Sequence, residues 1–330
     1  MICATWSVDD ATRIDLFLRK KIPALLEKNE LPVDQNSVSN SKIRRLIVAG
    51  AVSVNKKQCR IPSWTMQSGD EVRVAFDEDK FFFEKQPDDI QFEVTEQSVL
   101  YEDDVIIVVD KPAFFPTEET ITGSRDNLHA AVIRYLWKKN PSLRNPPYVG
   151  IMHRLDRETS GVILFTKTRA VNKNVFDMFE QHTAQKVYRA VCTRKMQLGK
   201  APLSEVPQKF CIDKPIGRIS ASSAACKMGV VETSNHHTNN VKEIQAARTD
   251  CLLIGKKDNC YYIEARPHTG RTHQIRVHLS WYGLPLVGDE LYGGEGGGRI
   301  MLHAQSLTFP HPVTGQMMCV ESPLPDGFQY

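Results

Sequence analysis

A single carboxylate lies between two arginines in residues 153–161, which read HRLDRETSG. Asp156 follows Arg154 by two residues and directly precedes Arg157. The apolar run that comes next, residues 162–165, is typical of a buried strand. Loop residues that a rigid strand positions often carry chemistry. The pattern therefore indicates an anionic catalytic group beside cations that can contact a phosphate backbone. A solvated loop with two salt bridges would give the same spacing.

Further blocks accompany this segment in a fixed order along the chain. They are residues 101–112 (YEDDVIIVVDKP), 186–190 (KVYRA), 266–279 (RPHTGRTHQIRVHL) and 288–304, which contains GD, LYG and LHA. Together with residues 153–161 they resemble the RluA-type pseudouridine synthases, which isomerise uridine in structured RNA. The resemblance covers about residues 100–320. An ordered set of motifs is more specific than any one of its members.

The resemblance implies roles for several residues. Asp156 is implied as the catalytic aspartate, Tyr188 as a ring that packs on the flipped uracil, and Arg271 as the arginine that pairs with Asp156. Arg154 is implied to fill the space that the flipped base leaves, and Arg157 is expected to contact RNA beside it. No metal and no organic cofactor are expected, because one glycosidic bond is exchanged for another. Taken alone, Tyr188 also fits a half-buried strand tyrosine.

A turn at residues 269–271 leads into a predicted helix over residues 272–282. Thr272 fits an N-cap and Gly283 fits the C′ glycine. Arg271 is therefore expected at the helix start, where it can reach across the cleft to Asp156. Arg276, one turn further on, is expected to contact RNA or to form a surface salt bridge.

Three histidines, at positions 268, 273 and 278, recur every five residues. A metal site is disfavoured, because helical ligands need three- or four-residue spacing to share a face and no cysteine pair accompanies them. His153 is expected to order the catalytic loop by hydrogen bonding. The glycine-rich residues 293–298 lack the Gly-Lys-Ser/Thr that a phosphate loop needs, so they predict a flexible loop.

Residues 1–76 predict a small RNA-binding domain. Apolar spacing predicts helices over residues 12–28 and 42–49, and alternation predicts strands that include residues 52–54 and 72–76. The pattern is similar to the small RNA-binding domain of some ribosomal proteins and tyrosyl-tRNA synthetases. Its expected phosphate contacts are Lys42, Arg44, Arg45, Lys56, Lys57 and Arg60. A solvated basic helix face is the alternative.

The remaining chain predicts an acidic linker, residues 77–97, and a catalytic domain, residues 98–330. Strand and helix signals are mixed without strict alternation, which predicts an α+β fold with a largely antiparallel sheet. The predicted strands are 105–109, 161–167, 187–192 and 261–265, and the predicted helices are 128–137 and 169–182. Residues 217–247, rich in Ser, Ala, Thr and Asn, predict a loop or hairpin insertion that is either an RNA-contacting flap or a tolerated loop.

Composition excludes several classes of protein. A hydrophobic content of 41% and a charged content of 25% are typical of a globular chain, and a net charge of +3 is too small to identify a nucleic-acid partner by itself. The eight cysteines form no C-x-x-C pair and predict free thiols in a reducing compartment. Signal-peptide and membrane-spanning patterns are absent, so a cytoplasmic location is expected. The sequence does not indicate the oligomeric state, and a monomer is taken as the default.

These features predict an RNA pseudouridine synthase that acts on large-subunit (23S) ribosomal RNA or its precursors, with transfer RNA as the alternative substrate. A non-catalytic RNA-binding ribosome-assembly factor on the same fold is the alternative from another class. The presence of Asp156, Tyr188 and Arg271 argues against it. A hydrolase of glycosidic bonds would need a second carboxylate opposite the first, and Glu158 is very close in sequence for that place.

Overall fold

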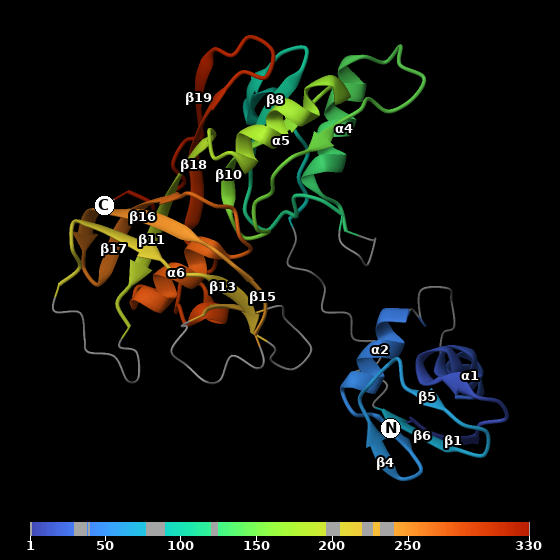
Figure 1. The fold of residues 1–330 in the computed structure, drawn as a ribbon. Coiled ribbons are helices and arrows are strands. Elements are labelled where there is room, and N and C mark those ends of the chain that lie inside the picture. Colours follow the sequence, from blue (N-terminus) through green and yellow to red (C-terminus); the bar gives the residue numbers. More distant parts are fainter. Residues whose placement is uncertain are drawn as a thin grey trace. The chain divides into compact units, whose positions relative to one another are not determined.

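The chain folds into two compact units, Met1–Pro87 and Asp88–Tyr330 (Figure 1). The computed structural model describes residues 2–29, 38, 40–76, 90–119, 125–195, 205–219, 227–231 and 241–329. Within these ranges no helix is long and apolar enough to cross a membrane. The seven cysteines in the same ranges are free thiols.

The first unit packs two helices on a small antiparallel sheet of strand order β1-β6-β3-β4, beside the pair β2–β5. The predicted inward faces are confirmed, because Ile14 and Leu18 of α1 and Val72 and Val74 of β6 are fully buried. Strand β1, which pairs with β6, was not predicted. The bounds are β1 (Ile2–Ser7), β2 (Thr12–Arg13), α1 (Ile14–Lys28), α2 (Asn40–Val48), β3 (Val52–Val54), β4 (Lys57–Cys59), β5 (Thr65–Met66) and β6 (Glu71–Phe76).

A ten-stranded mixed sheet forms the centre of the second unit. Its order is β12-β16-β17-β11-β18-β10-β8-β7, with β9 paired to β10 and β19 paired to β18. Among the strand pairs that the structure describes in this sheet, only β10 and β18 run parallel, so the prediction of a largely antiparallel α+β fold is confirmed. The strands are β7 (Val99–Glu102), β8 (Ile106–Lys111), β9 (Gly150–Ile151), β10 (Ser160–Thr166), β11 (Gln185–Thr193), β12 (Lys209–Asp213), β16 (Arg248–Lys257), β17 (Cys260–Pro267), β18 (Leu302–Pro310) and β19 (Met317–Glu321).

Helices cover both faces of this sheet. Helix α4 (Leu128–Lys139) packs on the face of β8 that carries Ile107 and Val109. Helix α5 (Asn172–Glu180) packs on the opposite face, which carries Ile106 and Val108. Alternating side chains of one strand thus enter two cores. Helix α6 (Gln274–Tyr282) packs against β16 and β17. The described short 3-10 helices are η1 (Glu96–Ser98), η2 (Arg169–Val171) and η4 (Glu290–Tyr292).

The expected linker and the expected loop or hairpin insertion both contribute residues to the cores of the second unit. Val94, inside the expected linker, is buried in the core of the second unit, whereas residues 77–89 lie outside the described residues. The described part of residues 217–247 belongs to a small sheet of order β14-β13-β15, with bounds β13 (Ile216–Ile219), β14 (Lys227–Val230) and β15 (Val241–Gln245). Met228 of β14 is buried with Val277 of α6, so this part of the insertion supports the second unit's core.

Candidate active site

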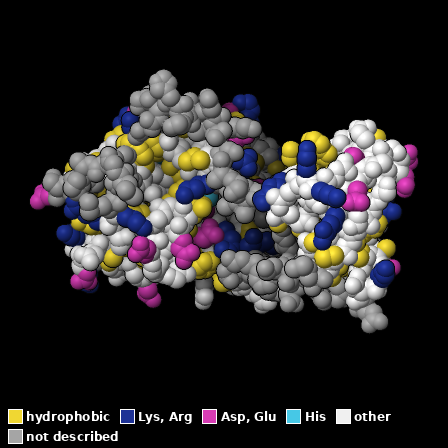
Figure 2. All heavy atoms as spheres, turned by 90° about the horizontal axis from the view of Figure 1, so that it is seen from below, with side chains coloured by type: hydrophobic (Ala, Val, Ile, Leu, Met, Phe, Trp, Pro, Cys, Tyr) yellow, Lys and Arg dark blue, Asp and Glu magenta, His cyan; other side chains and the backbone are white. Residues whose placement is uncertain are grey.

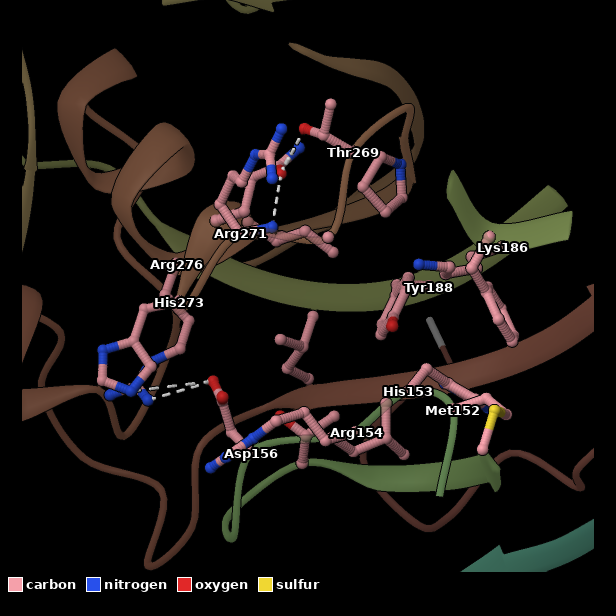
Figure 3. A pocket seen from close by; sticks show the side chains of 18 of the residues that line it. Met152, His153, Arg154, Asp156, Lys186, Tyr188, Thr269, Arg271, His273 and Arg276 are labelled. Carbon is pink, nitrogen blue, oxygen red and sulfur yellow. Dashed lines mark hydrogen bonds and ion pairs between the residues drawn. The ribbon is translucent and has the colours of Figure 1, made fainter. Parts of the chain in front are cut away.

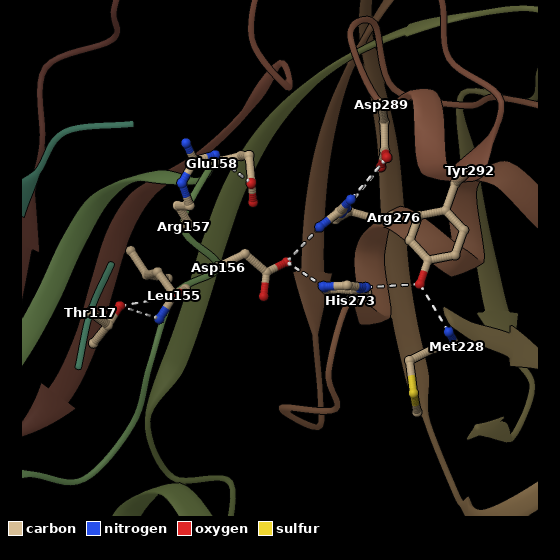
Figure 4. Close-up of polar contacts among 10 residues, drawn as sticks. All are labelled: Thr117, Leu155, Asp156, Arg157, Glu158, Met228, His273, Arg276, Asp289 and Tyr292. Atoms are coloured by element: carbon tan, nitrogen blue, oxygen red, sulfur yellow. Dashed lines mark hydrogen bonds and ion pairs between the residues drawn. The ribbon is translucent and has the colours of Figure 1, made fainter. Parts of the chain in front are cut away.

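Asp156 lies in the loop that enters β10, and the backbone on both sides of it is held. The Thr159 N–H donates to the Asp156 carbonyl at 3.1 Å and closes a turn. The Thr117 hydroxyl donates to the Leu155 carbonyl at 2.8 Å and accepts from the Leu155 N–H at 3.3 Å. The Leu155 side chain is itself buried in the core. These contacts fix the direction in which the Asp156 carboxylate points (Figure 4).

A buried cation ties the same loop to strand β8. Lys111 is fully buried, and its Nζ donates to the carbonyls of Pro112 at 2.9 Å, Phe115 at 2.7 Å and Arg157 at 3.0 Å. Burial lowers the pKa of Lys111 to about 7. The three carbonyl bonds offset the cost of burying the amine. Lys111 therefore positions the residue that follows Asp156.

Gly161 lets the strand that follows Asp156 approach its neighbour closely. Its φ is +112°, and a Cβ atom there would lie 2.1 Å from the carbonyl oxygen of Ala304. Strands β10 and β18 are parallel at this point, with Gly161 opposite Ala304. Only glycine combines this backbone conformation with this approach.

The arginine that reaches Asp156 is Arg276. Its Nη1 lies 3.3 Å from Asp156 Oδ2. Its Nε and Nη2 donate to the two carboxylate oxygens of Asp289 at 2.8 and 2.9 Å (Figure 4). Burial opposes the charge of Arg276, but the Asp289 hydrogen bonds and the charges of both aspartates raise its pKa above the ordinary value. The guanidinium is therefore charged and held in one orientation by a two-pronged pair.

This pairing corrects the expectation for Arg271. The Nε of Arg271 donates to the carbonyl of Ala246 at 3.2 Å, although its side chain still lines the pocket. Helix α6 begins at Gln274, two residues later than predicted. His273 precedes it in a left-handed conformation, with φ of 56°, and Gly283 ends it as predicted. Arg271 lies in the turn before the helix, as expected, but its side chain contacts Ala246 and does not pair with Asp156.

Burial excludes a surface salt bridge, one of the two expectations for Arg276, whereas contact with RNA stays a prediction. Every residue from 274 to 279 is buried, because α6 packs against β14 as well as β16 and β17. Only 5% of the Arg276 side chain is exposed, and Asp289 is fully buried. A charge at such a position needs a fixed counter-ion, and Asp289 supplies it.

His273 faces Asp156 with a favoured tautomer. The Met228 N–H donates to the Tyr292 hydroxyl oxygen at 3.1 Å, and that oxygen lies 2.8 Å from His273 Nδ1. Because the Tyr292 oxygen already accepts the Met228 hydrogen, the Tyr292 hydroxyl is expected to donate its own hydrogen to His273 Nδ1. Nδ1 then carries no hydrogen, so the hydrogen of the neutral His273 ring is on Nε2. Nε2 lies 3.9 Å from Asp156 Oδ2. Burial lowers the pKa of His273, so a neutral ring presents an N–H donor beside the carboxylate.

A pocket of about 450 Å³ opens beside these groups (Figure 3). Its size lies within the range of about 300–1,000 Å³ that is common for small-ligand sites. Tyr188 of β11 forms part of the wall, and burial together with the charge of Asp156 raises its pKa above the ordinary value. The pairing of β11 with β18 is irregular between Val187 and Tyr188. Such irregularities re-aim a side chain. Asp156, Tyr188 and Arg271 thus line one pocket, which also includes Arg276.

The two arginines that flank Asp156 lie in different surroundings. Arg154 lines the pocket, is 68% exposed and pairs with Glu118. Arg157 pairs with Glu158 at 2.9 Å. Glu158 is therefore held by its neighbour (Figure 4).

The basic residues of the first unit divide into exposed and buried positions. Arg44 and Lys56 are exposed, and Figure 2 shows Lys and Arg side chains on this unit. Lys42 is only 8% exposed, which corrects its expected place on the exposed face. It lies four residues before the buried Leu46, so both share the inward side of α2. The side chain of Arg45 lies outside the described residues.

The three regularly spaced histidines go to different partners. His268 Nε2 bonds Asp250 at 2.7 Å, and His278 Nδ1 bonds Thr249 at 2.9 Å, whereas His273 faces Asp156. Throughout the described ranges, no three His, Cys, Asp or Glu side chains are grouped as metal ligands.

His153 orders the loop, as the sequence predicted. Its Nε2 accepts the N–H of Leu164 at 3.0 Å, and its ring packs on Phe179 with centroids 4.4 Å apart. Burial, with a further contribution from the positive charge of Lys186, lowers the pKa of His153 to about 3. The ring is therefore neutral, and because Nε2 accepts, its hydrogen is on Nδ1.

Comparison with known proteins assigns the chain to a family. The family profile described as RNA pseudouridylate synthase matches residues 105–281, and the S4 domain profile matches residues 36–72. The chain belongs to the RNA pseudouridylate synthase family. It is an enzyme that isomerises uridine to pseudouridine and binds RNA, as the RluA-type motifs and the basic first unit predicted. This favours catalysis over the assembly-factor alternative.

Curated relatives match the chain over almost its whole length. An uncharacterised RNA pseudouridine synthase of Mycoplasma pneumoniae is 30% identical, covering 98% of this chain and 93% of that protein. Ribosomal large subunit pseudouridine synthase C of Escherichia coli K12 is 28% identical, covering 99% and 94%. Ribosomal large subunit pseudouridine synthase D of Neisseria meningitidis serogroup A is 30% identical, covering 96% and 77%. The solved structure of human RNA pseudouridylate synthase domain containing 1 has a TM-score of 0.52 and 25% identity, covering 70% of this chain and 84% of that one.

Three residues that support Asp156 received no role from the sequence. Asp289 and Tyr292 belong to the last motif block, and Thr117 belongs to none. The only available signal was that GD and LYG occur with the other blocks in order. Nothing in their local spacing indicates that they meet Arg276 and His273.

Proposed function

We propose that this enzyme isomerises specific uridines of large-subunit ribosomal RNA, with Asp156 as the catalytic carboxylate. The observation that best supports this proposal is the network in which Arg276 bridges two aspartates at the edge of the pocket. Asp289 is fully buried, whereas 22% of the Asp156 side chain is exposed. Asp156 is therefore the carboxylate of this network that a nucleotide in the pocket can meet.

The choice of RNA is supported by the relatives and by the first unit. Two of the relatives are named as ribosomal large subunit pseudouridine synthases, and both match this chain across both units. Exposed Arg44 and Lys56 of the first unit, with Arg154 at the pocket, are suited to phosphate contacts. We assign RNA binding to residues 1–76 and catalysis to residues 98–330, in a cytoplasmic monomer. Transfer RNA is the alternative substrate.

The pocket offers the groups that the isomerisation needs. The C1′–N1 bond breaks and a C1′–C5 bond forms, while C5 loses a proton and N1 gains one. Asp156 is placed to attack the nucleoside or to take a proton from it. Arg276 supplies positive charge beside the carboxylate, and the Nε2–H of His273 faces the same oxygen at 3.9 Å, beyond hydrogen-bond distance. The raised pKa of Tyr188 keeps its hydroxyl protonated, so Tyr188 suits packing on the uracil better than taking up a proton.

Release of the C5 hydrogen tests this proposal directly. The substrate is unmodified 23S ribosomal RNA transcribed with 5-tritiated uridine, with transfer RNA transcripts in parallel. Wild type should release tritium from the ribosomal RNA, and Asp156→Asn should release none. The matched control is Asp258→Asn, which makes the same change at an exposed loop position and should behave as wild type. Full activity of Asp156→Asn would refute the assignment, and release from transfer RNA alone would replace the substrate.

Phosphate contacts by the first unit are tested by salt dependence. Replacing Arg44 and Lys56 together by glutamine should weaken RNA binding and reduce the slope of log K against log salt by about 1 to 2. Lys209→Gln, an exposed change on β12, is the control and should leave affinity and slope near the wild-type values. An unchanged slope in the double variant would show that these two cations stay off the RNA.

A further inference from the structure

A half-buried lysine also lines the pocket, at the end away from Arg276. Lys186 of β11 precedes Tyr188 by two residues, and both side chains line the pocket. Figure 3 shows Lys186 and His273 at opposite sides of the view, with Tyr188 between them. In the part of the chain that the structure describes, no carboxylate lies at ion-pair distance from the Lys186 amine. The mechanism described above does not use this group.

The surroundings of Lys186 leave its charge largely uncompensated. Its Nζ lies 5.1 Å from the centroid of the Phe179 ring, which also packs on the neutral His153. A Cβ atom at Gly270 would lie 3.3 Å from Nζ, so the 269–270 turn closes over the amine on another side. A cation–π contact contributes about 0.5–2 kcal/mol, whereas removing an ammonium from water costs several kcal/mol. An anionic partner is therefore missing, and the pocket is the place for it.

We propose that Lys186 binds a phosphodiester group adjoining the target uridine. The proposal rests on the function above, in which that nucleotide occupies this pocket. Phosphate is the anion that RNA carries at every residue. Asp156 at the other end of the pocket repels a phosphate, while Lys186 attracts it. The two charges therefore orient the nucleotide, with the backbone toward Lys186 and the reacting sugar and base toward Asp156.

A neutral backbone linkage distinguishes this contact from other uses of the amine. The substrate is a short RNA that spans one target uridine, which is located by testing short labelled fragments of the RNA in the tritium assay. One of the two linkages of that uridine is replaced by a methylphosphonate, which has no charge, and each linkage is tested separately. Wild type should show a KM raised about 10-fold or more at one linkage and little change at the other.

The Lys186→Gln variant gives the decisive comparison. On unmodified RNA its KM should rise by a similar factor with kcat nearly unchanged, and the sensitive methylphosphonate should cause no further loss. Lys186→Arg should recover most of the affinity, because it keeps the charge. Lys209→Gln should respond to the methylphosphonate as wild type does.

Two results would overturn the proposal. One is a methylphosphonate that, at either linkage, raises the KM of Lys186→Gln by the same factor as it raises the KM of wild type, so that the two effects are additive. The other is a fall in kcat with KM unchanged and normal sensitivity to the neutral linkage, which would assign the amine to a uracil oxygen. Turnover of unmodified RNA by wild type is measured first. A wrong substrate then appears as no turnover, and a wrong role for Lys186 appears as normal turnover with additive effects.

Discussion

Asp289 and Asp156 hold the same guanidinium, yet replacing each by asparagine should have different consequences. Asp289 is fully buried and accepts two hydrogen bonds from Arg276, at 2.8 and 2.9 Å. Asp156 is 22% exposed and accepts a single one, at 3.3 Å. The asymmetry predicts that Asp289 anchors the arginine and that Asp156 is the group free to react.

The expected loss of stability follows from burial. Removing one partner of a buried ion pair typically costs about 3–5 kcal/mol. Asp289→Asn should lower the free energy of unfolding by about 3 kcal/mol, at the lower end of this range, because Asp156 still neutralises part of the Arg276 charge. Asp156→Asn leaves the buried pair intact and should cost about 0–1 kcal/mol, as a partly exposed pair does.

The two variants should also differ in activity. Asp156→Asn should abolish tritium release, because the reacting carboxylate is gone. Asp289→Asn keeps Asp156 but loosens Arg276, and a displacement of about 1 Å in a positioned group can cost about 100-fold in rate. Its kcat should therefore fall by about 10-fold to 100-fold while some activity remains.

Urea unfolding and tritium release check both parts. Unfolding is followed by far-UV circular dichroism and by tryptophan fluorescence, because the chain has two units and need not unfold in one step. Trp281 lies in α6 together with Arg276 and reports on that helix. Wild-type stability of Asp289→Asn, or an equal loss in Asp156→Asn, would refute the division of roles.

Three further predictions concern residues around the loop and the pocket. Wild type should lose stability as pH falls from 6.5 toward about 3, because the lowered pKa of His153 favours its neutral form in the folded state. This group contributes up to about 1.4 kcal/mol per pH unit, and His153→Gln, which keeps a non-titrating acceptor, should flatten the acid limb in urea unfolding. Gly161→Ala should lower the free energy of unfolding by about 3 kcal/mol or more, because of overpacking and backbone strain. The control Gly315→Ala, at φ of +71° with open space around it, should lower it by about 1–2 kcal/mol, and thermal unfolding measures both. Tyr292→Phe should lower kcat up to about 10-fold with KM little changed, because it removes the hydrogen bond of about 0.5–1.5 kcal/mol between the Tyr292 hydroxyl and His273 Nδ1 and lets the ring change tautomer; an unchanged kcat would show that this tautomer has no role.

The sequence by itself determined the features that depend on local spacing. Side chains two apart on a strand or three to four apart on a helix share a face, so the buried faces of α1 and β6 could be predicted without the fold. Asp156 could be placed in a loop before a strand for the same reason. The order of the motif blocks was sufficient to indicate the family, because several weak patterns in one order rarely occur together.

Positions whose burial depends on distant segments could not be predicted in this way. Lys42 belongs to a basic run in the sequence, but it is buried because it follows the inward side of α2. Val94 lies in an acidic stretch that resembles a linker, yet it enters the core of the second unit. In both cases the charge pattern of the surrounding residues gave no sign that this one side chain is buried.

Only the tertiary structure decided which arginine serves Asp156. Arg271 and Arg276 belong to one motif, and either could be expected to reach the cleft. The start of α6 and its packing on several sides set the rotation of the helix, which turns Arg276 inward. A buried guanidinium is stable there because Asp289 lies against it, while Asp156 comes from 120 residues earlier in the chain. Such a network depends on strand order and helix rotation, and these are set by packing between segments far apart in the sequence.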